Sequence, residues 1–373
     1  MFKYFDNAAT TIISNKALET YNNISLNYFA NPSANHSLGA LSKNKLEEYR
    51  NKIANLLYVN QSHIYFTSGG TESNSIILSS LLWTQNPGEI IISKTEHSSI
   101  INFKKILKEK GFKIIEINAP KGFVNPKTLE KKITKKTRMI VIQNVNNVVG
   151  SINDVEQLVK VVRLKEKEFK RKIYFHCDAV QSLGKIDLDL NKLDVDSASF
   201  SAHKFHGPRG IGFLYSKNNN ILPLSKGGGQ ESGIRGGTEN LPAIAAMYIA
   251  LENSIKTSND NVVDLNKYVR ENLKPQILSP SENYSPFIIN FSLKSFPSEV
   301  FTRMLNDEGF IVSAGSACSN NAKNMGDNVL TAMNFSPDVA KSSIRISFNK
   351  LSKMEDTQLL VKKINSLYDT LIR

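Results

Sequence analysis

The sequence has few cysteines, no long apolar run and no apolar leader at its start. Its two cysteines, Cys177 and Cys318, lie far apart without metal-ligand spacing, so we expect reduced thiols and no metal site. The longest apolar stretch, near 243–251, is much shorter than the ~18 residues that indicate a membrane span. Asp6 precedes any apolar region that could act as a signal peptide. We therefore expect a cytoplasmic protein with no membrane association.

Acidic residues are the minority among the charged side chains. The chain has 47 Lys and Arg against 34 Asp and Glu, a net charge of +13, which raises the question of an acidic partner. The basic residues cluster in segments 104–110, 131–138 and 163–172, where apolar residues recur at helical spacing between glutamates. This pattern is typical of solvated helix faces. We do not expect direct nucleic-acid binding, and transient contact with RNA or an acidic protein is the alternative.

Apolar runs and helical patterns alternate over most of the chain. With 373 residues, 40% of them hydrophobic, the chain can form two domains. We expect strands at 63–67, 89–93, 113–117, 139–144, 172–177, 197–201 and 212–215, and helices at 71–83, 99–110, 126–133 and 154–169. This alternation predicts an α/β fold with a doubly wound, mostly parallel sheet.

The pattern changes after a helical stretch at 240–258. A strand pattern at 286–293, a helix at 298–307 and a strand at 343–348 indicate a smaller α+β domain. We therefore place a large domain at 15–256 and a small domain at 1–14 and 257–373.

Small residues follow the first expected strand and precede a helix, in Thr67-Ser-Gly-Gly-Thr71. Backbone N–H groups and the positive helix end at this position can bind a phosphate. The spacing matches neither the Walker A motif nor the dinucleotide fingerprint. The alternative is a turn in which Thr71 only caps the helix.

Polar residues follow the next strands at what should be the same edge of the sheet. His97 follows the strand at 89–93, Asn146 and Asn147 follow the strand at 139–144, and Asp178 follows the strand at 172–177, three residues before Gln181. A buried Asp178 needs a positive partner, which a protonated pyridine nitrogen would supply. His97 could stack on an aromatic cofactor or could serve only as a cap. His176 and Cys177 are expected to be packed strand residues.

Lys204 lies in a turn-rich segment after the strand at 197–201. A lysine amine on a stiff, desolvated loop suits Schiff-base chemistry with an aldehyde cofactor, because burial lowers the lysine pKa. Taken alone, Lys204 could equally be a solvated surface lysine.

Together these motifs resemble the cysteine desulfurases of the NifS/IscS type, which are pyridoxal-phosphate (PLP) enzymes of fold type I in the class V aminotransferase group. The resemblance runs from Tyr4 to about Arg345 and includes the segments 6–11, 31–33, 67–74, 95–97, 145–147, 178–181, 201–204, 227–231, 235–240 and 315–318. It implies a PLP-dependent transferase fold with a large mixed-sheet domain, and a homodimer. The last segment, Gly-Ser-Ala-Cys318, is the most specific for desulfurases.

The resemblance also implies roles for individual residues. Lys204 would bond to PLP, His97 would stack on its ring and move protons, and Asp178 would pair with the ring nitrogen. The remaining cofactor contacts would come from Gly70, Thr71, Glu72, Asn147, Gln181, Ser201 and His203, with Thr238 reaching the phosphate across the dimer interface. Asn31, Asn147 and Arg345 would bind the substrate. Cys318, on a mobile loop, would receive the sulfur as a persulfide.

The implied reaction converts L-cysteine to L-alanine and passes sulfur to an acceptor for iron–sulfur cluster assembly or tRNA thiolation. Val148, the segment 348–351, the polar residues after Cys318 and the short tail after Arg345 depart from the family pattern, so the acceptor stays open. The alternatives are a selenocysteine lyase or another class V PLP enzyme, such as kynureninase or an aminotransferase. A further alternative is an inactive paralogue that binds partners in sulfur relay or RNA modification.

Overall fold

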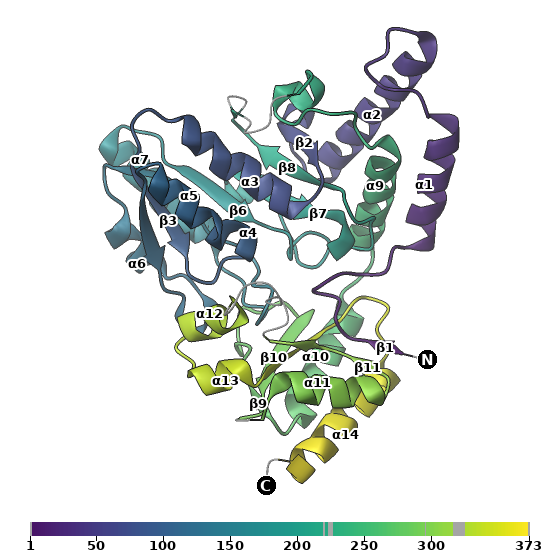
Figure 1. Ribbon diagram of the computed structural model, residues 1–373, viewed down its shortest axis with the longest axis vertical. Helices are drawn as coiled ribbons and strands as arrows, with labels where there is room; N and C mark the ends of the chain where they lie inside the picture. The colour runs from purple at the N-terminus through teal and green to yellow at the C-terminus, as the bar shows by residue number, and fades with distance from the viewer. Residues whose placement is uncertain (1, 219–220, 223–226, 295, 316–324, 372–373) are drawn as a thin grey trace.

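A seven-stranded mixed sheet forms the centre of the larger part of the molecule (Figure 1). The computed structural model describes residues 2–218, 221–222, 227–294, 296–315 and 325–371. The sheet has the order β2 (Ile64–Thr67), β8 (Gly212–Ser216), β7 (Ser197–Ser201), β6 (Tyr174–Asp178), β5 (Thr137–Val141), β3 (Glu89–Ser93) and β4 (Lys113–Ile117). Within this sheet β8 alone runs opposite to the other six strands, so the fold predicted from the alternation is confirmed.

The two faces of this sheet are covered by helices because its strands are apolar on both sides. Ile90 and Ile92 on β3 pack in a core with α3 (Gly70–Ser80), α4 (Ser98–Ile101) and α5 (Phe103–Glu109). Ile91, which points the other way, packs in a core with α7 (Val155–Phe169) and α6 (Pro126–Lys132). The short helix α8 (Leu190–Leu193) contacts α7, and α1 (Asn15–Asn27) and α2 (Ser37–Leu56) pack on α9 (Leu241–Lys256).

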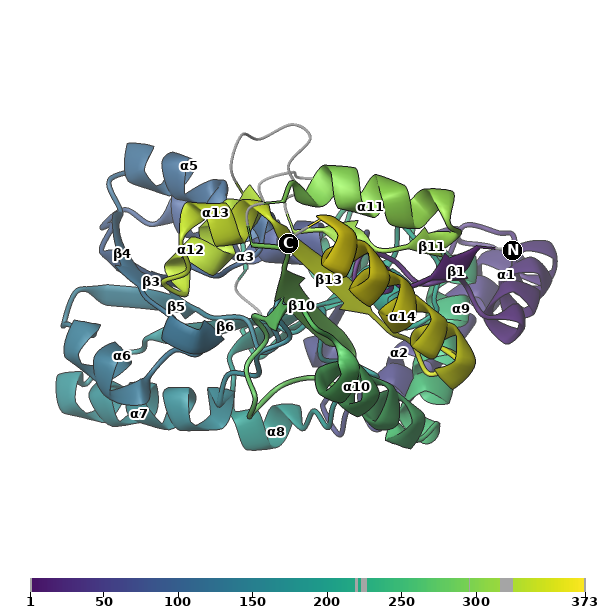
Figure 2. The ribbon, with the colours of Figure 1, turned by 90° about the horizontal axis from the view of Figure 1, so that it is seen from below.

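A smaller antiparallel sheet lies beyond the carboxyl ends of the parallel strands. Its order is β12 (Ser313–Ala314), β13 (Ser343–Ser347), β10 (Ile288–Ser292) and β9 (Gln276–Ile277). It is accompanied by α10 (Asp260–Asn272), α11 (Ser298–Asp307), α12 (Met325–Ala332), α13 (Pro337–Lys341) and α14 (Met354–Leu371) (Figure 2). The amino-terminal strand β1 (Lys3–Tyr4) pairs with β11 (Phe310–Ile311), so the first residues of the chain join this part. The domain boundary at 256/257 stays a prediction and falls between α9 and α10.

Several predicted boundaries differ from the structure. The strand expected at 139–144 is β5, which ends at Val141, although the N–H groups of Ile142 and Asn144 still donate to β6 residues. The helix expected at 99–110 is divided into α4 and α5 at Asn102. The helix expected at 71–83 ends as α3 at Ser80 and continues as a 3-10 turn.

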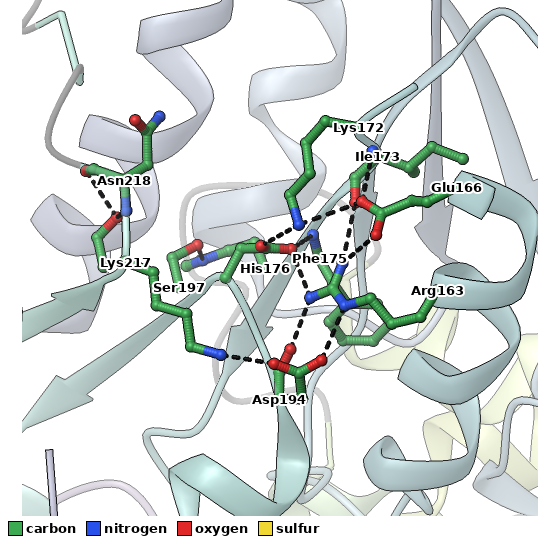
Figure 3. Close-up of polar contacts among 12 residues, drawn as sticks. Arg163, Glu166, Lys172, Ile173, Phe175, His176, Asp194, Ser197, Lys217 and Asn218 are labelled. Carbon is green, nitrogen blue, oxygen red and sulfur yellow. Dashed lines mark hydrogen bonds and ion pairs between the residues drawn. The ribbon is translucent and has the colours of Figure 1, made fainter. Parts of the chain in front are cut away.

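Ion pairs neutralise much of the basic segment 163–172. Arg163 contacts Asp194 and Asp196, both at 3.0 Å, and Lys172 contacts Glu166 at 3.1 Å (Figure 3). These pairs join α7 to the amino-terminal ends of β6 and β7. The local pairing favours the interpretation of this segment as a solvated helix face.

Candidate active site

A cavity of about 590 Å³ lies at the carboxyl ends of the parallel strands. In a doubly wound sheet this edge is where ligands bind, because the loops after the strands converge there. Ala8, Ala9 and Thr10 of the amino-terminal segment close one side of the cavity, and Arg345 on β13 closes another. Residues from three distant parts of the chain therefore form one site.

Most of the predicted site residues line this cavity. They are Gly70, Thr71, Glu72, His97, Asn147, Asp178, Gln181, Ser201, His203, Lys204 and Arg345. Asn31 and Thr238 are exposed and do not line it in the single chain. Thr238 was expected to act on a second subunit, which a single chain does not test. Cys318 lies outside the described residues.

The amino-terminal end of α3 forms an anion cradle. Gly69 has φ +146°, and a Cβ on Gly70 would lie 2.4 Å from Cγ2 of Val180, so a larger residue at Gly70 would displace the Val180 side chain in the turn after β6. The first N–H groups of a helix have no partner in the helix and attract a phosphate. Ser201 borders the same space, 3.1 Å from the position of a Cβ on Gly69.

The side chain of Glu72, a predicted cofactor contact, contacts Ser68 and Arg235. Its carboxylate accepts from the N–H of Ser68 and pairs with Arg235 at 3.3 Å. A carboxylate repels a phosphate, so only the backbone of Glu72 can contribute to phosphate binding. Its side chain instead closes the turn before α3.

Asp178 lies buried on the floor of the cavity and is held by two donors. Asn74 Nδ2 donates to Oδ2 at 3.0 Å, and the N–H of Val180 donates to Oδ1 at 3.1 Å. The fixed carboxylate can accept one more hydrogen bond from a protonated ring nitrogen above it.

His97 caps helix α4 and lines the cavity. Its Nδ1 lies 2.9 Å from Ser99 Oγ and accepts the N–H of Ser99 at 3.2 Å. Burial lowers the pKa of His97, with the charge of Asp178 acting in the opposite direction. A lowered pKa favours the neutral ring, which suits stacking on another ring.

The amine of Lys204 lies between two backbone carbonyls. Nζ donates to Ala8 O at 2.8 Å and to Ala9 O at 2.7 Å. Gln181 Nε2 also donates to Ala8 O, at 2.9 Å, and Gln181 Oε1 accepts from Lys185 Nζ at 2.6 Å. Because an ammonium group or amine donates to Oε1, Gln181 must present its NH₂ group toward the Lys204 side of the cavity.

The amino-terminal segment that carries these carbonyls is bound to both parts of the molecule. Phe5 O accepts from the N–H of Ser347, and Ser347 Oγ accepts from the N–H of Ala8 at 2.8 Å. On the other side, the N–H of Thr11 donates to His203 O at 2.9 Å. The segment therefore connects β13 to the turn that holds Lys204.

Arg345 is oriented by two acceptors. One terminal nitrogen pairs with Asp6 Oδ1 at 2.7 Å, and the other donates to Asn147 O at 2.8 Å. Its Nε is buried and has no hydrogen-bond partner among the residues that the structure describes. The guanidinium lines the cavity, and its planar, permanently charged fork suits a carboxylate ligand.

A second cavity of about 340 Å³ adjoins the first and shares His97, Asn147 and Arg345 with it. Gly315 lines this second cavity, three residues before Cys318. Glu96 lines it as well, and burial raises the pKa of Glu96 well above its usual range. The Gly-Ser-Ala-Cys318 motif thus begins at the wall of a space that opens toward His97 and Arg345.

Four of these residues had no role in the sequence predictions: Asp6, Asn74, Ser99 and Lys185. Asp6 and Asn74 belong to segments that carry the family resemblance, but their functions depend on contacts with residues over 100 positions away. Lys185 could have been noticed only as a lysine within an apolar segment. No sequence pattern places its amine beside Gln181.

The donor set fits PLP. The cavity offers an anion cradle for the phosphate, a buried carboxylate for the ring nitrogen, an amide NH₂ group for the ring oxygen and a lysine amine for the aldehyde. A family model, aminotransferase class-V, matches residues 3–360. The fold and the site thus define a PLP-dependent enzyme of the class-V aminotransferase family.

Individual relatives narrow this class. A NifS/IcsS protein homolog of Lactobacillus delbrueckii subsp. bulgaricus is 37% identical, with 98% of this chain and 97% of the relative covered. A cysteine desulfurase IscS of Dictyoglomus turgidum is 35% identical, with 99% and 95% covered. The solved structure of a NifS-like protein has a TM-score of 0.91 and is 34% identical, with both chains fully covered. The solved structure of SspA in complex with cysteine has a TM-score of 0.81 and is 31% identical, with 93% of this chain and 98% of SspA covered. The chain belongs to the cysteine desulfurases of the NifS/IscS type.

Across the described ranges, no helix has the length and apolar character needed to cross a membrane.

Proposed function

We propose that this protein removes sulfur from L-cysteine, releases L-alanine and holds the sulfur as a persulfide on Cys318. The observation that carries the proposal is the convergence of Lys204, Asp178, His97 and Arg345 on one cavity, in a chain of the cysteine desulfurase family. The similarity to the solved structure of SspA in complex with cysteine supports cysteine as the substrate.

The roles of the chain's own residues follow from their contacts. Arg345 binds the substrate carboxylate with its guanidinium group, which lines the cavity. Lys204 Nζ takes the α-proton, because its amine lies at the cavity wall with backbone carbonyls to hold it when protonated. Bound PLP would supply an aldehyde carbon for the substrate amine and an electron sink for the adjacent carbon, and Asp178 would hold its ring nitrogen.

Sulfur transfer needs a thiolate, and Cys318 is the residue we assign to it. Its Sγ attacks the substrate sulfur, an S–S bond forms, and the C–S bond breaks with its electron pair left on carbon. That carbon then takes up one proton to become the methyl group of alanine, and the α-carbon regains the proton that it lost. A thiol reductant later releases the sulfur as sulfide, or an acceptor protein takes it for iron–sulfur cluster assembly or tRNA thiolation.

A homodimer with Thr238 at the partner's phosphate site is part of this proposal. Exposed apolar side chains occur on and beside α1 and α2, where Ile12, Leu26 and Phe29 are each at least 70% exposed. A large exposed apolar patch is typical of an interface. Light scattering of the purified protein tests whether it is a dimer. Thr238→Ala should weaken PLP binding and leave the dimer intact. The cytoplasmic location stays a prediction.

The test uses L-cysteine, a reductant and four proteins: wild type, Lys204→Ala, Cys318→Ala and Cys177→Ala. The wild type should form alanine and sulfide in equal amounts, and both Lys204→Ala and Cys318→Ala should lose turnover. Cys177→Ala is the matched control because Cys177 is fully buried and burial raises the pKa of its thiol, so it should retain activity. Equal alanine release by Cys318→Ala and wild type would disprove the persulfide step.

A selenocysteine lyase is the second candidate, since the same cavity would accept L-selenocysteine. Competition between L-cysteine and L-selenocysteine at equal concentration separates the two functions. We expect alanine to form from L-cysteine. Alanine formation from L-selenocysteine but not from L-cysteine would favour the lyase.

A further inference from the structure

Asn74 connects Asp178, expected at the ring nitrogen of the cofactor, with Ser99, which contacts His97. It is buried on α3, with 1% of its surface exposed. Its Nδ2 lies 3.0 Å from Asp178 Oδ2 and 2.9 Å from Ser99 Oγ, and its Oδ1 lies 2.9 Å from His176 Nε2. One amide thus has three side-chain partners, two of which belong to or contact the predicted cofactor residues.

The chemistry of Asp178 determines which way the Asn74 amide points. A carboxylate oxygen accepts hydrogen bonds, so the atom of Asn74 that faces it must be the NH₂ nitrogen. The amide oxygen then faces His176, whose Nε2 must carry a proton. His176 Nδ1 can accept from Ser197 Oγ at 2.8 Å, a contact drawn in Figure 3. Burial lowers the pKa of His176 to about 4, which agrees with a neutral ring carrying this one proton.

The second hydrogen of the Asn74 amide determines which ring nitrogen of His97 carries the proton. It is donated to Ser99 Oγ, which leaves the hydroxyl hydrogen of Ser99 for His97 Nδ1 at 2.9 Å. The backbone N–H of Ser99 donates to the same nitrogen at 3.2 Å. With two donors directed at Nδ1, the proton of a neutral His97 must be on Nε2.

We propose that Asn74 is a positioning residue that orients Asp178 and, through Ser99, holds His97 as the neutral tautomer protonated on Nε2. This inference rests on the proposed function. In this tautomer His97 can donate a proton from Nε2 but cannot accept one at that atom. The α-proton must then be taken by Lys204, and His97 is left to donate.

The tautomer can be measured directly in the PLP-loaded enzyme. The protein is labelled with ¹⁵N-histidine, and long-range ¹H–¹⁵N spectra are recorded, with the His97 signals assigned from His97→Gln. We expect Nδ1 of His97 to have the shift of an unprotonated nitrogen and Nε2 that of a protonated one. A protonated Nδ1 in the wild type would overturn the proposal.

Asn74→Ala tests the connection that the Asn74 amide makes. We expect a mixture of His97 tautomers, a shifted PLP absorption band and alanine formation about tenfold to a hundredfold slower, the range for losing a hydrogen bond to a charged group. Asn266→Ala is the control, because Asn266 is also fully buried and its amide donates to Pro286 O and accepts from Arg270. This control should lose stability and keep the wild-type His97 signals and absorption band.

The outcomes separate the two proposals. If Asn74→Ala keeps the wild-type His97 signals and absorption band, the positioning role is wrong. If the wild type forms no alanine from cysteine, the proposed function is wrong. The NMR measurement of the His97 tautomer still tests the positioning role of Asn74 in that case.

Discussion

Replacing Lys185 with methionine should make the molecule more stable at neutral pH. Lys185 is 5% exposed, and its amine donates to Gln181 Oε1. Burial lowers the pKa of Lys185 well below its usual range, and the charges of Lys204 and Arg345 lower it further. Methionine fills a similar volume without an amine that must be taken out of water.

The sign of the pH dependence follows from proton binding. Between the lowered pKa of folded Lys185 and the unfolded value of about 10.4, the unfolded chain binds more protons than the folded one. The free energy of unfolding of the wild type therefore rises with pH, by at most about 1.4 kcal/mol per pH unit for one proton. Lys185→Met lacks this term, so its advantage over the wild type should shrink by up to about 2.7 kcal/mol between pH 7.5 and 9.5.

Urea unfolding at pH 7.5, 8.5 and 9.5 measures this difference. Lys267→Met is the control, because Lys267 lies on α10 with 70% of its side chain exposed, and its difference from the wild type should not change with pH. If the difference between wild type and Lys185→Met is also the same at all three pH values, the buried lysine does not lose its proton on folding and the reasoning is wrong. Lys185→Met should also be less active, because Gln181 Oε1 loses the donor that fixes the orientation of its amide in the cavity.

Two further predictions concern charged pairs. Asp6→Asn weakens the pair that orients Arg345, so the KM for cysteine should rise about three- to tenfold with kcat within about twofold in steady-state assays, as expected for about 1 kcal/mol of substrate binding; a fall in kcat alone would contradict this role. Glu231→Gln breaks the buried pair with Arg50, whose two contacts are 2.7 Å long, and should lower the free energy of unfolding by about 3–5 kcal/mol in urea. A loss below about 1 kcal/mol would show that Glu47, which also contacts Arg50, is sufficient as its partner.

The sequence predicts the large sheet well because its strands are short apolar runs bounded by polar turns. Ile90, Ile91 and Ile92 are buried on both faces of β3, and such a run is visible without a structure. The end of β5 was harder to predict, since its apolar run continues past Val141 while its backbone still bonds to β6. The division of α4 from α5 also has no clear sequence signal, because Asn102 keeps helical backbone angles.

The site is predictable where it depends on chain topology. His97, Asp178 and Lys204 gather because each follows a parallel strand, whose carboxyl ends meet at one edge. The contacts that orient them could not be predicted, because Asn74 reaches Asp178 and Lys185 reaches Gln181 through side-chain directions that no spacing rule gives. The part played by Glu72 illustrates the same limit, since its side chain turns back to Ser68.

The carbonyl contacts of Lys204 have a practical consequence for mutagenesis and protein engineering. Ala8 and Ala9 bind the lysine through main-chain atoms, so a scan that only truncates side chains in this region leaves the binding atoms in place. A backbone change, such as a proline or a one-residue deletion between Asp6 and Thr11, would shift both carbonyls at once. An affinity tag joined before β1 acts on the same continuous stretch of backbone, so tag placement belongs among the variables that an assay of this enzyme must control.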